Sequence, residues 1–253
     1  MSFCGIARSE LTMVLKQKRV RKVLTSKIRQ LYDIVADIDG LLTEMETEFY
    51  RVCIFGSARI SSDSAIYQQV EKLAEGLSRL GVDIVTGGGP GLMEAANKGA
   101  KAGSKGAWSI GLPIELPFES DANSHLDVKS QHRRFSSRLD EFMRLSHAVI
   151  MVPGGIGTLL ELFYTWQLMQ VNHIKPRPLV LLADDESWQQ LMEWLRKFPL
   201  ANKLMSERDF SMLKLAHSVD EVVKILEVDI NRFRTENKDG NRKRKSADQS
   251  SDE

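Results

Sequence analysis

The sequence predicts an α/β protein in which helices cover both faces of a mainly parallel sheet. From Tyr50 onward, short apolar runs alternate with segments of helical periodicity, which is typical of repeated strand–helix–strand units. The runs are apolar at consecutive positions, as expected for parallel strands buried on both faces. The expected strands are 51–55, 82–86, 108–112, 148–152 and 179–182, and the expected helices are 65–80, 91–102, 134–145, 158–170, 188–198 and 219–226. This order predicts a Rossmann-like three-layer sandwich over residues 49–230.

Two segments flank this domain and differ from it in composition. Residues 1–48 carry apolar side chains at helical spacing, which predicts an N-terminal helical extension that packs on the core or on a partner chain. The start of the extension is basic, as a presequence would be, but Asp33, Asp37 and Asp39 favour a structural helix. Residues 231–253 are polar and lack apolar periodicity, so we expect a disordered charged tail. Its basic run Arg242–Lys245 is short, which favours a solvated segment over a nucleic-acid or localisation patch.

Composition excludes several classes of protein. The formal net charge is +1 over 253 residues, so no overall field points to nucleic acid or to a membrane. No apolar run approaches the roughly 18 residues that a transmembrane helix needs. The two cysteines, Cys4 and Cys53, are far apart and form no CxxC pair, which favours a reducing cytoplasmic location. The five histidines lack ligand spacing, so we expect neither a metal nor another cofactor.

Three glycine-containing turns follow three of the expected strands. The first contains Gly56 and Ser57, the second contains Gly88 and Gly89, and the third runs from Pro153 to Thr158. Parallel strands place such turns at one edge of the sheet, where they form a cleft lined by backbone. Expected substrate-binding residues are Gly56, Ser57, Gly88, Gly89, Gly154, Gly155, Gly157 and Thr158. Neither GxGxxG after the first strand nor Gly-Lys-Ser/Thr occurs, which disfavours NAD binding and ATP hydrolysis.

The third turn predicts chemistry in addition to binding. It delivers glycines onto a helix start, where backbone N–H groups and the helix dipole favour a phosphate. Glu161 lies one helical turn beyond Thr158 on the same face. A carboxylate near a phosphate is unfavourable for binding alone, so it indicates a reaction on the group attached to that phosphate. Arg133, Arg134 and Arg138 precede the fourth expected strand, and a guanidinium near Glu161 would keep its carboxylate ionised.

These residues resemble a known family. Pro153-Gly154-Gly155-x-Gly157-Thr158-x-x-Glu161, with Gly87-Gly88-Gly89-Pro90-Gly91-Leu92-Met93 upstream, is similar to the LOG ("Lonely Guy") family, whose members were often labelled lysine decarboxylases. The resemblance covers roughly residues 50–226. It implies a homodimer that hydrolyses the N-glycosidic bond of nucleoside 5′-monophosphates, AMP or cytokinin ribotides among them, to free base and ribose 5-phosphate. It also implies Glu161 and Arg138 as the catalytic residues, although the family often has Arg-Lys where this chain has Arg138-Leu139.

Three other functions remain open at this point. A nucleotide or phospho-ligand carrier would share the glycine cleft without needing Glu161. A DNA-associated protein is supported only by the basic extension and tail. Amino-acid decarboxylation would need a lysine that forms a Schiff base with pyridoxal phosphate, and no lysine lies in an evident apolar cofactor pocket. Expected partners are therefore a nucleoside monophosphate and a second copy of the chain, with no membrane and no nucleic acid.

Overall fold

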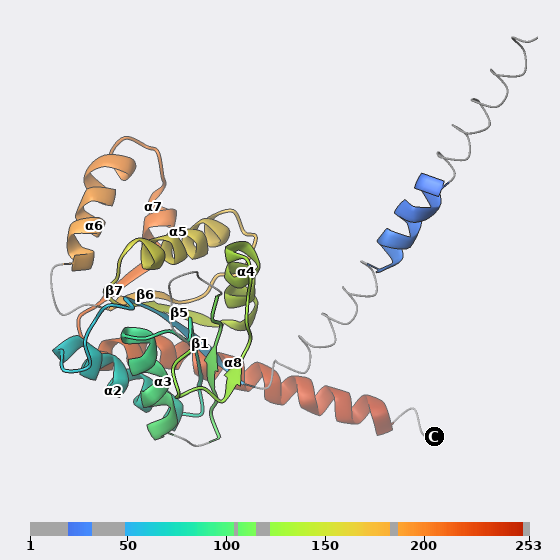
Figure 1. Cartoon of the computed structure of the whole chain (residues 1–253), viewed down its shortest axis with the longest axis horizontal. Coiled ribbons are helices and arrows are strands. Elements are labelled where there is room, and N and C mark those ends of the chain that lie inside the picture. The colour runs from blue at the N-terminus through green and yellow to red at the C-terminus, as the bar shows by residue number, and fades with distance from the viewer. Residues whose placement is uncertain (1–19, 32–48, 104–105, 115–121, 183–186, 250–253) are drawn as a thin grey trace, which may run out of the picture. The chain divides into compact units, whose positions relative to one another are not determined.

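The computed structural model describes residues 20–31, 49–103, 106–114, 122–182 and 187–249. The chain divides into two compact units, Met1–Glu48 and Phe49–Glu253. The second unit contains the predicted sandwich (Figure 1).

A seven-stranded sheet forms the centre of this unit, in the order β4-β3-β2-β1-β5-β6-β7. Every pair of neighbouring strands is parallel, as predicted. The strands are β1 Arg51–Phe55, β2 Asp83–Thr86, β3 Ser109–Gly111, β4 Val128–Lys129, β5 Ala148–Met151, β6 Leu179–Leu182 and β7 Leu213–Ala216. The helices are α2 Ala65–Arg79, α3 Leu92–Gly103, α4 Phe135–Leu145, α5 Ile156–Gln170, α6 Ser187–Leu195, the π-helix η1 Arg196–Leu200, α7 Glu207–Ser211 and α8 Val219–Gln249.

The sheet separates two hydrophobic cores. Alternate residues of a strand point to opposite faces, so Val52 and Ile54 of β1 enter one core while Cys53 and Phe55 enter the other. Helices α2, α3 and α8 cover the first face, and α4, α5 and α6 cover the second (Figure 1). Both sides of each central strand are therefore buried, which explains why apolar side chains dominate these strands.

The predicted elements agree with the structure except at the short strands and near the C-terminus. β4, β7 and α7 were not predicted, because β4 and α7 are short and the exposed Lys214 interrupts the apolar run of β7. Residues beyond the expected boundary at 230 also contact the domain. Phe233 packs at 5.4 Å, centroid to centroid, against Tyr50, and Arg234 donates to the carbonyl of Leu80. Helix α8 thus continues the buried stripe of Leu226 and Ile230 beyond the boundary and runs to Gln249, where a disordered tail was expected.

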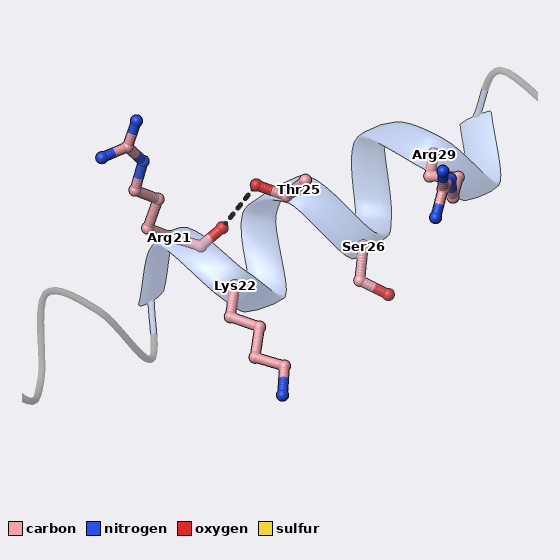
Figure 2. Close-up of a pocket in the computed structure, with 5 residues that line it drawn as sticks. All are labelled: Arg21, Lys22, Thr25, Ser26 and Arg29. Carbon is pink, nitrogen blue, oxygen red and sulfur yellow. Dashed lines mark hydrogen bonds between the residues drawn. The ribbon is translucent and has the colours of Figure 1, made fainter.

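In the first unit, the structure describes one helix, over residues 20–31. Figure 2 shows the polar side of this helix, where Thr25 Oγ1 donates to the carbonyl of Arg21 at 2.8 Å. Basic and hydroxyl side chains gather there: Arg21, Lys22, Thr25, Ser26 and Arg29. Val20, Leu24, Ile28 and Leu31 recur at helical spacing on the other side. This segment therefore has the predicted amphipathic pattern, and the rest of the expected extension lies outside the described residues.

Candidate active site

The sheet order places a topological switch point between β1 and β5. The chain builds β1 to β4 outward on one side and then β5 to β7 on the other. In open parallel sheets, ligands bind beyond the carboxyl ends of the strands at such a point. The three predicted glycine turns follow β1, β2 and β5, which are neighbours in the sheet. The prediction that they meet at one edge is confirmed.

Close backbone contacts join the turn after β1 to the other two turns. Ser57 N donates to the carbonyl of Pro153 at 3.1 Å, and the carbonyl of Ser57 accepts from Leu92 N at 2.9 Å. Gly91 makes the second contact possible, because its φ is +69° and a β-carbon there would lie 2.5 Å from the Ser57 carbonyl. Gly56 is equally constrained, with a would-be β-carbon 2.4 Å from Val152 Cγ2. The floor of the cleft is therefore fixed.

The turn after β5 presents the start of helix α5 at the cleft. Gly155 is the N-cap residue, and as a glycine it has no side chain that could cap the first N–H groups of the helix. Gly154, Gly155 and Gly157 are exposed, whereas Thr158 is buried against Gly154. An uncapped helix start with exposed backbone suits an anion, because its orphan N–H groups and the helix dipole both favour negative charge.

The turn after β2 is instead fastened within the protein. Gly88 N donates to Thr86 Oγ1 at 2.9 Å, and the carbonyl of Gly88 accepts from Asn123 N at 2.8 Å. Asn123 Nδ2 donates to the carbonyl of Gly89 at 2.9 Å and to Asn97 Oδ1 at 3.0 Å. The predicted binding residues Gly88 and Gly89 therefore use these polar groups internally.

Sequence reasoning missed this network of polar side chains. Its centre is Asn97, which is fully buried on α3; it accepts from Thr86 Oγ1 at 2.7 Å and donates to Ser109 Oγ at 2.9 Å. The sequence offered one sign of this network: Asn97 stands among the small residues Ala95, Ala96, Gly99 and Ala100 of the predicted helix. A buried amide needs hydrogen-bond partners, so it marks a fixed polar contact.

Arg138 reaches the same edge from α4. Its Nε donates to the carbonyl of Leu112 at 2.6 Å, and its Nη2 donates to the carbonyl of Gly87 at 3.2 Å. The guanidinium carbon also lies 5.2 Å from the centroid of the Phe142 ring. Arg133 and Arg134 are exposed before α4 begins. Of the three arginines considered from sequence, the structure thus anchors Arg138 over the carboxyl ends of β2 and β3.

Glu161 lies on the flank of α5 that faces α4. On the same flank, Tyr164 donates to Asp140 of α4. Burial raises the pKa of Glu161 to about 7, and the positive charge of Arg138 opposes that rise. The charge of Arg138 thus acts on Glu161, and this environment places the carboxyl group between its acid and base forms near neutral pH.

A cavity of about 400 Å³ opens on the other side of the turn after β5. Pro153, Leu159 and Trp188 are among the residues that line it. Leu159 faces α6, whereas Glu161 faces α4, so α5 separates this cavity from the carboxylate.

Two further properties concern the described residues alone. They contain no group of three or more histidine, cysteine, aspartate or glutamate side chains that could hold a metal ion. None of their helices is long and apolar enough to cross a membrane.

The fold and this edge define a Rossmann-like α/β protein with an exposed, glycine-rich helix start followed by a carboxylate. Residues 93–226 match the family model described as "Possible lysine decarboxylase", and the chain belongs to this family, the LOG family. The resemblance seen in the sequence is therefore confirmed.

Known relatives extend the comparison. The chain is 31% identical over 160 residues to a probable cytokinin riboside 5′-monophosphate phosphoribohydrolase from rice, which covers 60% of this chain and 61% of that protein. It is 32% identical over 145 residues to the pyrimidine/purine nucleotide 5′-monophosphate nucleosidase of Escherichia coli K12, covering 54% of this chain but 31% of the nucleosidase. It thus spans less than two thirds of either relative. A molybdenum cofactor binding protein from Rippkaea orientalis shares the fold, with a TM-score of 0.55 and 20% identity over 72% of this chain and 98% of that one.

Proposed function

We propose that this protein hydrolyses the N-glycosidic bond of nucleoside 5′-monophosphates, giving a free base and ribose 5-phosphate. One observation carries the proposal: the half-buried carboxyl group of Glu161 lies one helical turn beyond the uncapped start of α5, within the influence of Arg138. The names of the rice and Escherichia coli relatives support the same reaction.

The 5′-phosphate would bind the first N–H groups of α5, at the exposed turn of Gly154, Gly155 and Gly157, with Thr158 below it. From there, one helical turn, roughly 5 Å, leads to Glu161 and matches the step from phosphate to ribose. Gly56 and Ser57 would border the ribose side. Because the phosphate does not react, its binding energy serves to position the bond that does.

Glu161 would act on the sugar. As the bond between C1′ and the base nitrogen breaks, positive charge develops on the ribose, and an ionised carboxylate stabilises that charge. The same group can orient the water whose oxygen adds to C1′, while a proton goes to the departing base. Arg138 favours the ionised form of Glu161 against the effect of burial. This arrangement needs no metal and no bound cofactor.

The base is the less defined part of the substrate. The rice relative is named for cytokinin ribotides and the Escherichia coli relative for both pyrimidine and purine nucleotides. AMP is our proposed reference substrate because adenine occurs in both classes.

We also infer that the working form is a homodimer that uses the outer face of α5. Ile156, Leu160 and Phe163 lie there at helical spacing and are 88%, 47% and 40% exposed. Contiguous apolar side chains of this size mark an interaction surface. A second copy covering α5 would also exclude water from the edge where Glu161 lies.

The experiment is incubation with a mixture of nucleoside monophosphates, with free bases resolved by chromatography. Wild type should release base, whereas Glu161→Gln should not, although it still binds AMP. Glu193→Gln is the matched control, because the exposed Glu193 of α6 pairs with the exposed Lys197 of η1. Adenosine should be a poor substrate. AMP binding without base release by wild type would instead support the carrier function.

A further inference from the structure

The turn Gly87–Gly89 is as rich in glycine as a phosphate-binding loop, but most of its backbone polar groups form hydrogen bonds within the protein. Its three carbonyls accept from Arg138 Nη2, Asn123 N and Asn123 Nδ2, and the N–H of Gly88 is used by Thr86. Gly87 and Gly88 are themselves buried. Carbonyl oxygens repel a phosphate, so this turn differs from the exposed start of α5.

Two of its glycines are explained without a ligand. A β-carbon on Gly87 would lie 2.4 Å from Arg138 Nη2, so a larger residue would occupy the position of the guanidinium. Gly88 has φ +72°, a conformation that side chains other than glycine's rarely adopt. Glycine at these positions therefore allows the arginine to approach the backbone and the backbone to turn beneath it.

Three polar side chains lock the turn in place. Thr86 Oγ1 accepts from Gly88 N and donates to Asn97 Oδ1, and Asn123 Nδ2 donates to the same oxygen. Asn97 is fully buried, so the oxygen that accepts both bonds is shielded from solvent. These bonds connect β2, α3 and the segment before β4. They hold the turn whose carbonyls accept from Arg138 and Asn123.

We propose that the Gly87–Gly89 turn is a mount for Arg138 and not a contact for the nucleotide, with Thr86, Asn97 and Asn123 as positioning residues. The inference rests on the proposed function for its kinetic consequences. It replaces the expectation that Gly88 and Gly89 bind substrate, and leaves the phosphate to α5.

The mount would act on Glu161 through charge. Among the described residues, Arg138 on α4 and the buried thiol of Cys53 on β1 interact electrostatically with this carboxyl group. Arg138 is the cation of the pair, so moving it away would leave burial unopposed and raise the pKa of Glu161 further.

The test compares Gly87→Ala with Gly76→Ala in the full chain. Gly76 lies in α2, and a β-carbon there meets nothing within 4 Å. Gly87→Ala should lower kcat by about 10- to 100-fold, as expected for a misplaced catalytic group. The acid limb of its pH–rate profile should move up by about one pH unit. The preference for AMP over adenosine should persist. A raised KM for AMP with unchanged kcat and a lost preference for AMP would overturn the proposal.

A second pair avoids the steric clash. Thr86→Val removes the hydroxyl at nearly constant volume, and Thr86→Ser keeps it. The valine variant should show the same kinetic signature as Gly87→Ala, and the serine variant should restore the wild-type profile. A valine variant that loses thermal stability but keeps its kcat and pH profile would reduce Thr86 to a purely structural role and contradict the proposal.

A direct titration separates this inference from the proposed function. In protein with ¹³C-labelled glutamate, the Glu161 carboxyl signal is identified by its loss in Glu161→Gln. Its pKa should rise in Gly87→Ala and Thr86→Val and stay unchanged in Gly76→Ala. If wild type released no base, the proposed function would fail, yet this titration would still decide whether the turn mounts the arginine. An unchanged pKa in folded Gly87→Ala would refute the mount.

Discussion

Thr158 and Gly154 are packed against each other so closely that a β-carbon on Gly154 would lie 2.1 Å from Thr158 Oγ1. Thr158 is 3% exposed and belongs to the first turn of α5. The glycine turn and the start of the helix are therefore one packed unit. The directions of the exposed N–H groups depend on this contact.

Replacing Gly154 with alanine should disturb that unit. Because the clash involves the rigid, buried Thr158 side chain, the backbone must move, and we expect kcat/KM for AMP to fall by about 10- to 100-fold. Steady-state kinetics with AMP measure the effect, with Gly76→Ala as the control. Wild-type kinetics in Gly154→Ala would show that the direction of these N–H groups does not matter.

The rate should depend on the ionisation of Glu161. If its carboxylate is the active form, kcat/KM for AMP should rise with pH through about 7, the pKa that burial gives this group, and then level off. The profile is measured by base release between pH 5 and pH 9. A rate that is flat through this window, or that falls as pH rises, would contradict the role assigned to the carboxylate.

The same carboxyl group should lower stability at high pH. Folding raises the pKa of Glu161 from 4.5 to about 7. Its protonated form therefore gives its full contribution to the free energy of unfolding below pH 4.5, and this contribution is lost as the pH rises through 7. Since the side chain is partly exposed, we expect Glu161→Gln to be more stable than wild type at pH 8 by about 1–2 kcal/mol. Chemical denaturation at pH 8 and at pH 4.5 provides the comparison, and the gain should vanish at the lower pH.

The proposed dimer should be sensitive to charge on the outer face of α5. Leu160→Glu would place a carboxylate in the centre of the apolar surface, so it should shift the protein toward monomer, because burying an unpaired charge is costly. Light scattering coupled to size exclusion measures this. Trp194→Glu is the control, since Trp194 is an exposed apolar residue of α6. A monomeric wild type would remove the dimer proposal.

His147 should make the protein acid-sensitive. It accepts from Arg51 N at 3.0 Å, and burial, followed by the charges of Arg51 and Arg177, lowers its pKa from 6.5 to about 4. The neutral side chain gives its full contribution to the free energy of unfolding above pH 6.5. As the pH falls from 6.5 to about 4, we expect this contribution to be lost, by about 1–3 kcal/mol.

The variant that tests this is His147→Asn, whose amide oxygen can still accept from Arg51 N. It should be less stable at pH 7, because it loses the stacking of His147 on Tyr50. It should also lose less stability than wild type between pH 6.5 and pH 4, measured by urea denaturation. Parallel losses would assign the acid sensitivity to other groups.

The layered fold and the edge that holds the site could be predicted because periodicity determines them. Apolar side chains dominate strands that are buried on both faces, and the three glycine turns had to meet once the sheet was parallel. The sequence alone could not distinguish the role of Gly88 from that of Gly155. Both are glycines after strands, but only the structure shows that Gly88 N–H donates to Thr86 while the start of α5 lacks a cap.

The long-range contacts were beyond prediction for a related reason. Asn97 and Asn123 are far apart in the sequence, and neither carries a motif. Their hydrogen bond exists because α3 and the segment before β4 meet at one turn. Phe233 was likewise placed in a polar tail, since its partners Tyr50 and His147 lie at distant positions in the chain.

The switch point between β1 and β5 has a consequence for how the protein can be divided. All strands on one side of it, β1 to β4, precede all strands on the other side, β5 to β7. A cut between Lys129 and Phe135 would therefore give two fragments, each with an unbroken half of the sheet. Glu161 would belong to one fragment and Gly87 to the other, so base release would appear upon reassembly of the two pieces.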